Sequence, residues 1–148
     1  MSRQDYVYVT YIATTPEKLW EALTTPEFTR QYWGGRTIES DWEIGSAARM
    51  KRPDGNYDWE GEIVECDPPR LLSYTWNSFS TLEGGASTRV TFRIEPYGSL
   101  MRLTVLHEGF EPESPFLKSI SQGWPAILSS LKTMLETGKA LVYDAWKG

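Results

Sequence analysis

The only histidine of the chain, His107, is the residue best suited to acid–base chemistry, because an imidazole titrates near neutral pH. It ends a stretch of period-two alternation and shares one side with Leu103 and Val105, so it is predicted to face inward from a strand. There it could exchange a proton or orient a polar ligand group. The simpler interpretation, which we favour, is a core histidine bonded to the backbone.

Other reaction centres are disfavoured. One histidine and one cysteine, Cys66, cannot supply the usual nitrogen and sulfur ligands of a metal ion. No nucleophile elbow accompanies the many hydroxyl residues. The pairs Gly34-Gly35 and Gly84-Gly85 lack the spacing and the lysine of a phosphate-binding loop. We therefore expect no metal and no cofactor.

Two further candidates also have structural interpretations. Asp58, Glu60 and Glu62 share one face of a predicted strand, where a solvated outer face paired with Arg49 and Lys51 explains them. Cys66 has no flanking cation or helix start to lower its pKa, so a buried inert thiol is favoured over a reactive one.

The aromatic content is high, with seven Trp, eight Tyr and five Phe. Large rings either line a ligand pocket or fill a core, and both interpretations stay open. If buried, the hydroxyl of Tyr74 and the indole N–H groups of Trp59 and Trp76 need partners, which a ligand's polar end could supply. The predicted ligand-binding residues are Trp33, Met50, Trp59, Tyr74, Trp76, Phe92, Leu103, Val105, His107, Leu117, Ile120, Trp124 and Leu128.

The first elements that must position these residues are a strand and two short helices. Residues 4–12 alternate and are rich in aromatic and β-branched types, which predicts a strand. Thr15-Pro16-Glu17 and Thr25-Pro26-Glu27 each offer a capping hydroxyl, a proline and an early acid, so each predicts a helix start. Gly34-Gly35 ends the second helix.

Residues 36–109 predict a series of antiparallel strands. A turn at 53–56 places Lys51 opposite Asp58, Arg49 opposite Glu60 and Met50 opposite Trp59. Residues 78–88 are predicted to form a flexible loop that, with the 34–35 connection, gates the pocket.

A second hairpin and a terminal helix complete the predicted fold. Pairing 94 with 101 places Phe92 opposite Leu103, but it also sets Arg93 against Arg102, so the register shifts or Glu95 relieves the repulsion. Helical spacing over 112–138 predicts a long helix, and Pro125 predicts a kink within it. The tail 139–148 is expected to pack on the domain or on a second subunit.

Composition sets the class of protein. The 148 residues favour a single domain over 1–148. The net charge of −5, without a basic run, argues against nucleic acid and anionic membranes as partners. No window approaches a membrane span, and the N-terminus lacks a signal-peptide core, so we expect a cytoplasmic protein. Strands followed by a terminal helix define an α+β class.

A resemblance to a known family rests on the order of several short segments. They are Thr15-Pro16-Glu17-Lys18-Leu19-Trp20, Thr25-Pro26-Glu27, Tyr32-Trp33, Pro53-Asp54-Gly55, Pro69-Arg70-Leu71-Leu72-Ser73-Tyr74-Thr75-Trp76 and Gly123-Trp124-Pro125. The chain resembles the START/Bet v 1-like (SRPBCC) helix-grip superfamily, and within it the AHSA1-like branch, named after an activator of the Hsp90 ATPase. The resemblance implies a curved seven-stranded antiparallel sheet that grips a kinked C-terminal helix, often around an apolar cavity. Superfamily members include lipid-binding proteins and enzymes.

Three functions follow as hypotheses. The leading one is non-catalytic binding of a small hydrophobic or aromatic molecule between the sheet and the C-terminal helix. The second is a cyclase- or lyase-type enzyme that uses His107 as its acid–base group. The third is an interaction protein, with a chaperone partner or a second copy in a homodimer.

Overall fold

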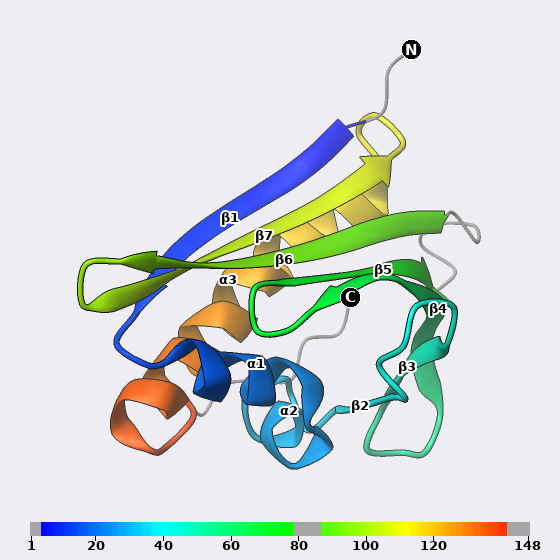
Figure 1. Cartoon of the computed structure of the whole chain (residues 1–148). Helices are drawn as coiled ribbons and strands as arrows, with labels where there is room; N and C mark the ends of the chain where they lie inside the picture. Colours follow the sequence, from blue (N-terminus) through cyan, green and yellow to red (C-terminus); the bar gives the residue numbers. More distant parts are fainter. Residues whose placement is uncertain (1–3, 79–86, 142–148) are drawn as a thin grey trace.

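Seven antiparallel strands form one sheet in the order β1-β7-β6-β5-β4-β3-β2 (Figure 1). The computed structural model describes residues 4–78 and 87–141. The strands are β1 (Gln4–Ile12), β2 (Thr37–Ser40), β3 (Ala47–Lys51), β4 (Tyr57–Asp67), β5 (Leu71–Ser78), β6 (Ser87–Tyr97) and β7 (Leu100–Phe110). The predicted α+β class and the seven-stranded antiparallel sheet are confirmed.

Two short helices, α1 (Pro16–Thr24) and α2 (Pro26–Tyr32), lie between β1 and β2 as predicted. The side chain of Thr15 caps α1 by accepting a hydrogen bond from the Lys18 amide at 3.2 Å. The same prediction for Thr25 is wrong, because its side chain makes no capping bond to α2. Thr25 instead ends α1, and its backbone N–H donates to the carbonyl of Glu21. The two helices follow each other too closely for Thr25 to start the second in the same way.

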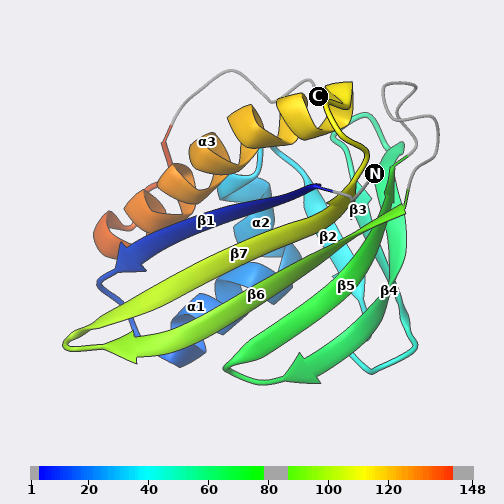
Figure 2. The same cartoon turned by 90° about the horizontal axis from the view of Figure 1, so that it is seen from above.

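The long helix α3 (Pro115–Thr137) runs through Pro125. Ser114 caps its start by accepting from the Leu117 amide at 3.0 Å, so the helix begins slightly later than predicted. Gly138 ends it in the left-handed conformation that glycine favours. Figure 2 shows the sheet curved around α3, with α1 and α2 beside it. The fold is therefore a helix grip, and the kink at Pro125 stays a prediction.

The β3–β4 hairpin has most of the predicted register. Met50 lies opposite Trp59 and Arg49 opposite Glu60, with the latter pair's charged atoms 3.7 Å apart. The expected pairing of Lys51 with Asp58 is wrong, because a bulge places Tyr57 opposite Lys51. The bulge removes Asp58 from the solvated outer face. Asp58 instead forms ion pairs with Arg36 and Arg52, and the Arg36 side chain is only 8% exposed.

The β6–β7 hairpin is shifted by two residues from the first predicted register. Ile94 pairs with Leu103, and Phe92 pairs with Val105. The shift places Glu95 opposite Arg102, with charged atoms 3.4 Å apart, so the like-charge contact of Arg93 with Arg102 is avoided. The shift moves the turn one residue along the chain, and it places opposite charges across from each other on the outer face.

The free edge of β2 is covered by α2. The buried hydroxyl of Thr29 accepts a hydrogen bond from the Ile38 amide at 3.1 Å, and α2 packs along β2. An edge strand usually presents such amides to any other chain, so Thr29 satisfies a group that would otherwise be available for pairing.

None of the helices in the described part of the chain is long and apolar enough to cross a membrane. Of the tail, residues 142–148 lie outside the described residues. Leu141 is 45% exposed, and its amide donates to the Ser130 hydroxyl.

Candidate functional site

The predicted ligand-binding residues meet in one layer between the sheet and α3. All are buried except Leu117, which is half-buried. Alternation along β4–β7 turns one side chain in two toward the helix, and helical spacing turns one face of α3 back toward the sheet.

Stacked rings form the centre of this layer. The ring of Trp59 on β4 lies between two rings of β5, with its centroid 5.0 Å from that of Tyr74 and 4.6 Å from that of Trp76. Both pairs are close to parallel. The ring of Trp124 on α3 meets Trp33 and Trp76 edge-on at 5.3 and 6.0 Å. Four tryptophans, from the C-terminal cap of α2 and from β4, β5 and α3, therefore form one cluster, which we call the indole cluster (Trp33, Trp59, Trp76 and Trp124).

His107 lies beside this cluster and is fully buried. Its Nδ1 accepts a hydrogen bond from the indole N–H of Trp124 at 3.2 Å. Because an indole nitrogen can only donate, the imidazole proton is on Nε2. Nε2–H then donates to the Thr88 hydroxyl at 2.8 Å, and that hydroxyl donates to the Trp76 carbonyl at 3.0 Å. Both ring nitrogens are satisfied by a continuous chain of bonds in one direction.

Burial lowers the pKa of His107 to about 3, because the charged imidazolium would lose its hydration. The imidazole is therefore neutral at neutral pH. No carboxylate is among its hydrogen-bond partners, which are Thr88 and Trp124. The inward orientation predicted from alternation is confirmed, and the favoured interpretation as a structural histidine is supported, with side chains in place of backbone groups as partners.

Thr88 is the residue that sequence reasoning missed. The prediction of a loop over 78–88 is wrong at both ends, because Ser78 belongs to β5 and Ser87 and Thr88 belong to β6, while residues 79–86 lie outside the described part of the structure. The alternation of Val90, Phe92 and Ile94 extends back to Thr88, so the inward position of this side chain was present as a signal.

The other two kinds of reaction centre considered from the sequence are a metal site and a reactive thiol at Cys66. No group of three or more His, Cys, Asp or Glu side chains there could hold a metal ion. Burial, with a smaller contribution from Asp67, raises the pKa of the Cys66 thiol, which disfavours the reactive thiolate. Cys66 is half-buried rather than fully buried.

Residues 13–136 match the family described as activator of Hsp90 ATPase homolog 1-like protein, AHSA1. The chain belongs to this family. A chain of similar fold is that of the Aha1 dimer from Colwellia psychrerythraea, solved in solution, with a TM-score of 0.77 and 22% identity, covering 93% of this chain and 99% of that one. No curated protein matches the sequence.

Two other solved structures show the same fold as this AHSA1-family chain. A crystallised protein from Mesorhizobium loti has a TM-score of 0.77 and 25% identity, covering 89% of this chain and 96% of that one. An Hsp90 activator from Plasmodium falciparum has a TM-score of 0.73 and 18% identity, covering 88% of this chain and 95% of that one. The predicted family resemblance is confirmed.

Among the residues that the structure describes, two buried indole donors of this AHSA1-family member have no hydrogen-bond partner. They are the Nε1–H groups of Trp33 and Trp59, whose side chains are 2% and 1% exposed. Native interiors leave few buried polar groups unpaired, because each costs about 1–3 kcal/mol. A buried Trp59 indole N–H needs a hydrogen-bond partner, and no described residue supplies one. The indole N–H of Trp33 lacks a partner among these residues in the same way.

Proposed function

We propose that this chain binds a small planar apolar or aromatic molecule, without catalysis, against the indole cluster between the sheet and α3. The observation that carries the proposal is the pair of unpartnered indole donors at Trp33 and Trp59 in this buried layer. A flat ring would extend the stacking already present, and an acceptor on its edge would take the free N–H groups. We place this activity in the cytoplasm.

Entry to the indole cluster would pass the connection between α2 and β2. A Cβ atom on Gly35 would come within 3.0 Å of the Pro53 ring on the β3–β4 turn, so the two segments touch. Next to this contact, an ion pair joins Arg36, which directly precedes β2, to Asp58 on β4. In this proposal a ligand enters by parting these two segments, which extends the predicted role of Gly34-Gly35 as a gate.

The test uses 8-anilinonaphthalene-1-sulfonate, which has fused rings and a sulfonate acceptor. We expect saturable fluorescence enhancement with the wild type and about tenfold weaker affinity for Trp33→Phe or Trp59→Phe, which keep a ring and lose the donor. Trp20→Phe is the matched control, because Trp20 lies on α1 and outside the cluster, and it should bind like the wild type.

Circular dichroism must show that each variant is folded before affinities are compared. Equal affinity in the wild type and both cluster variants, or no saturable signal at all, would overturn the proposal. Weakening by Trp20→Phe alone would do the same, because it would place the dye on the surface.

A second candidate function, self-association through β1, is favoured by an apolar outer surface. Val7, Val9 and Tyr11 on β1 are 55%, 43% and 38% exposed. Tyr97 at the β6–β7 turn is 54% exposed, and its ring centroid is 4.9 Å from that of Tyr11. An exposed apolar strip on an edge strand is typical of a protein interface. A structural neighbour is an Aha1 dimer, so we propose a second copy as the partner.

Sedimentation velocity over a concentration series tests this second candidate. We expect concentration-dependent dimers for the wild type and monomers for Val9→Lys, because an ammonium group would be buried without a partner. Ile44→Lys is the control, since Ile44 is 71% exposed on the β2–β3 connection and should leave the dimer intact. A monomeric wild type at all concentrations contradicts the prediction.

A further inference from the structure

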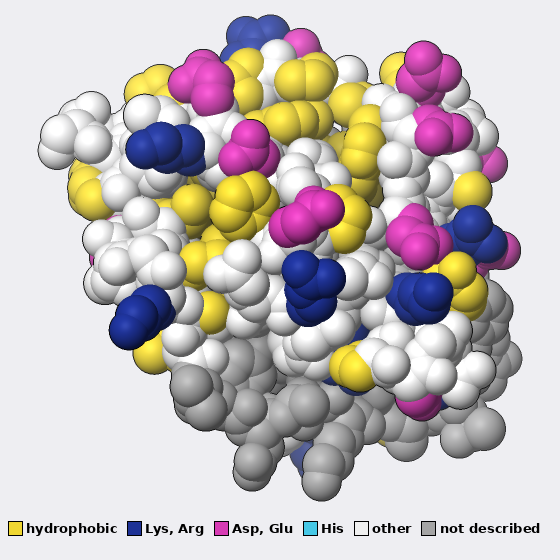
Figure 3. All heavy atoms as spheres, turned by 90° about the horizontal axis from the view of Figure 1, so that it is seen from below, with side chains coloured by type: hydrophobic (Ala, Val, Ile, Leu, Met, Phe, Trp, Pro, Cys, Tyr) yellow, Lys and Arg dark blue, Asp and Glu magenta, His cyan; other side chains and the backbone are white. Residues whose placement is uncertain are grey.

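Two surface hollows meet on the side of the molecule formed by α1 and α2. One has a volume of about 390 Å³ and lies between α1 and the turn of Pro68 and Pro69. The other has about 400 Å³ and lies between Pro26, Ile38 and the β2–β3 connection. Thr24 lines both, so the two hollows adjoin at this residue, and together they are here called the α1–β2 groove. In Figure 3, hydrophobic side chains are open on this underside, with both acidic and basic side chains among them.

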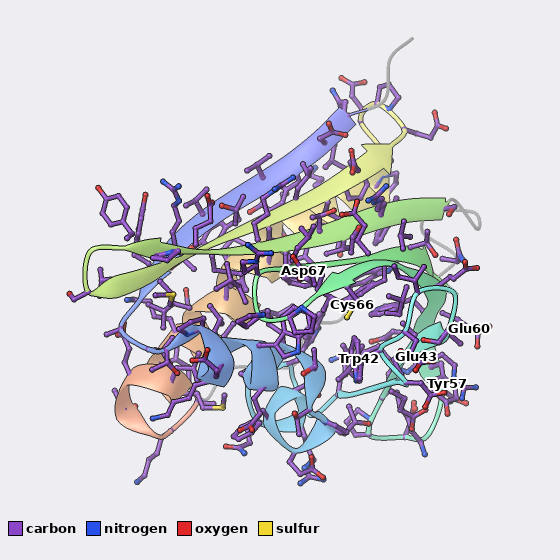
Figure 4. All side chains as sticks on the ribbon, in the orientation of Figure 1. Trp42, Glu43, Tyr57, Glu60, Cys66 and Asp67 are labelled. Carbon is purple, nitrogen blue, oxygen red and sulfur yellow. The ribbon has the colours of Figure 1, made fainter. Side chains whose placement is uncertain are left out.

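Each end of the α1–β2 groove has a half-buried tryptophan and two carboxylates. On α1, the spacing of Glu17, Trp20 and Glu21 brings the three to one wall of the first hollow. In the second hollow, Trp42 lies with Glu39 and Asp41. Figure 4 shows Trp42 on the side of β2 toward the helices, whereas Tyr57 and Glu60 lie away from them. Both ends thus combine an aromatic face with negative charge.

The charges of the α1–β2 groove are not balanced from within. Glu17, Glu21 and Asp41 form no ion pair within residues 4–78 and 87–141. The guanidinium of Arg49 is the single cation among the lining residues, and it is shared between Glu39 at 3.9 Å and Glu60 at 3.7 Å. A ligand that fits would therefore bring positive charge to both ends.

Backbone pairing by a peptide is disfavoured in this groove. The Ile38 amide on the edge of β2 is already bonded to Thr29, and α2 covers that edge. A strand added there would have to displace both. The volumes of the two hollows are in the range of small-molecule sites, which favours a compact ligand over a polypeptide.

We propose that the α1–β2 groove binds a linear aliphatic polyamine, with one ammonium group at each tryptophan–carboxylate end and the methylene chain across Thr24 and Pro26. Ammonium groups interact with the faces of Trp20 and Trp42 as cation–π pairs and with the carboxylates as ion pairs. The methylene chain lies along Thr24 and Pro26 between them. This site is separate from the buried indole cluster and does not depend on it.

Isothermal titration calorimetry with spermidine at low salt tests the proposal. We expect saturable binding to the wild type, about threefold weaker for Glu21→Gln or Asp41→Asn, and about tenfold weaker for the double variant, because each end contributes separately. Butylamine, with a single cation, should bind more weakly than spermidine. Glu62→Gln is the matched control, since Glu62 is exposed on β4, outside the groove, and should bind like the wild type.

Three results would overturn the polyamine proposal. The first is an absence of saturable heat with spermidine. The second is equal weakening by Glu62→Gln and by the groove variants, which would show general charge attraction. The third is binding of a lysine-rich peptide to a protein that does not bind spermidine, which would make the occupant a polypeptide.

Discussion

Replacing Gly61 by alanine is expected to destabilise the fold by at least about 3 kcal/mol, because the new methyl group has no space. A Cβ atom at this position would lie 1.7 Å from the Thr75 carbonyl oxygen and 2.5 Å from its carbonyl carbon. The obstacle is backbone, so no side-chain rotation relieves it. β4 and β5 approach closely here, and the Thr75 hydroxyl accepts from the Glu62 amide at 2.9 Å.

Urea unfolding of Gly61→Ala and Gly45→Ala measures this effect against a matched control. A Cβ on Gly45 would meet nothing within 4 Å, so only the strain of its positive φ of 92° remains, at about 1–2 kcal/mol. Gly61→Ala should also change the near-ultraviolet circular dichroism, since Trp59 and Trp76 flank the contact. A loss no larger than that of Gly45→Ala would contradict the close approach of β4 and β5.

The second large effect is a pH dependence from His107. In the unfolded chain this group protonates as pH falls below 6.5, whereas burial in the folded state lowers its pKa to about 3. Between these values the unfolded state binds the extra proton, so the free energy of unfolding decreases as pH falls. The slope is about 1.4 kcal/mol per pH unit, which amounts to about 2 kcal/mol between pH 6.5 and about pH 5.

Urea unfolding at about pH 7 and about pH 5, for the wild type and His107→Leu, isolates this slope by difference. The variant is expected to be less stable at neutral pH, because the Trp124 indole loses its acceptor, but it should lack the histidine's share of the pH dependence. Most carboxylates have pKa values below about 5, so they contribute little to the change in stability between about pH 7 and about pH 5.

A second measurement does not depend on how well His107→Leu folds. The NMR shift of the His107 Cε1 proton in the folded wild type should stay constant down to about pH 5. Titration of that proton near pH 6.5 would show an accessible imidazole. It would revive the hypothesis of an acid–base enzyme.

Much of the fold could be predicted because its signals are local. Alternation identified the strand of residues 4–12, and Thr15-Pro16-Glu17 identified the start of α1. Errors arose where one local pattern served two elements. Thr25 ends α1, and its side chain makes no capping bond to α2. The bulge between β3 and β4 breaks the expected pairing of Asp58 with Lys51, and Asp58 pairs with Arg36 instead.

The sequence by itself determined the family, the order of the elements and which side chains face inward, including His107, since these depend on residue type and on periods of two and 3.6. Only the tertiary structure decided the partners of those side chains. Thr88 and Trp124 reach His107 from β6 and α3, and Trp33 and Trp59 are left with open donors. Hydrogen bonding depends on distances of a few tenths of an ångström between elements far apart in the chain, which no local pattern specifies.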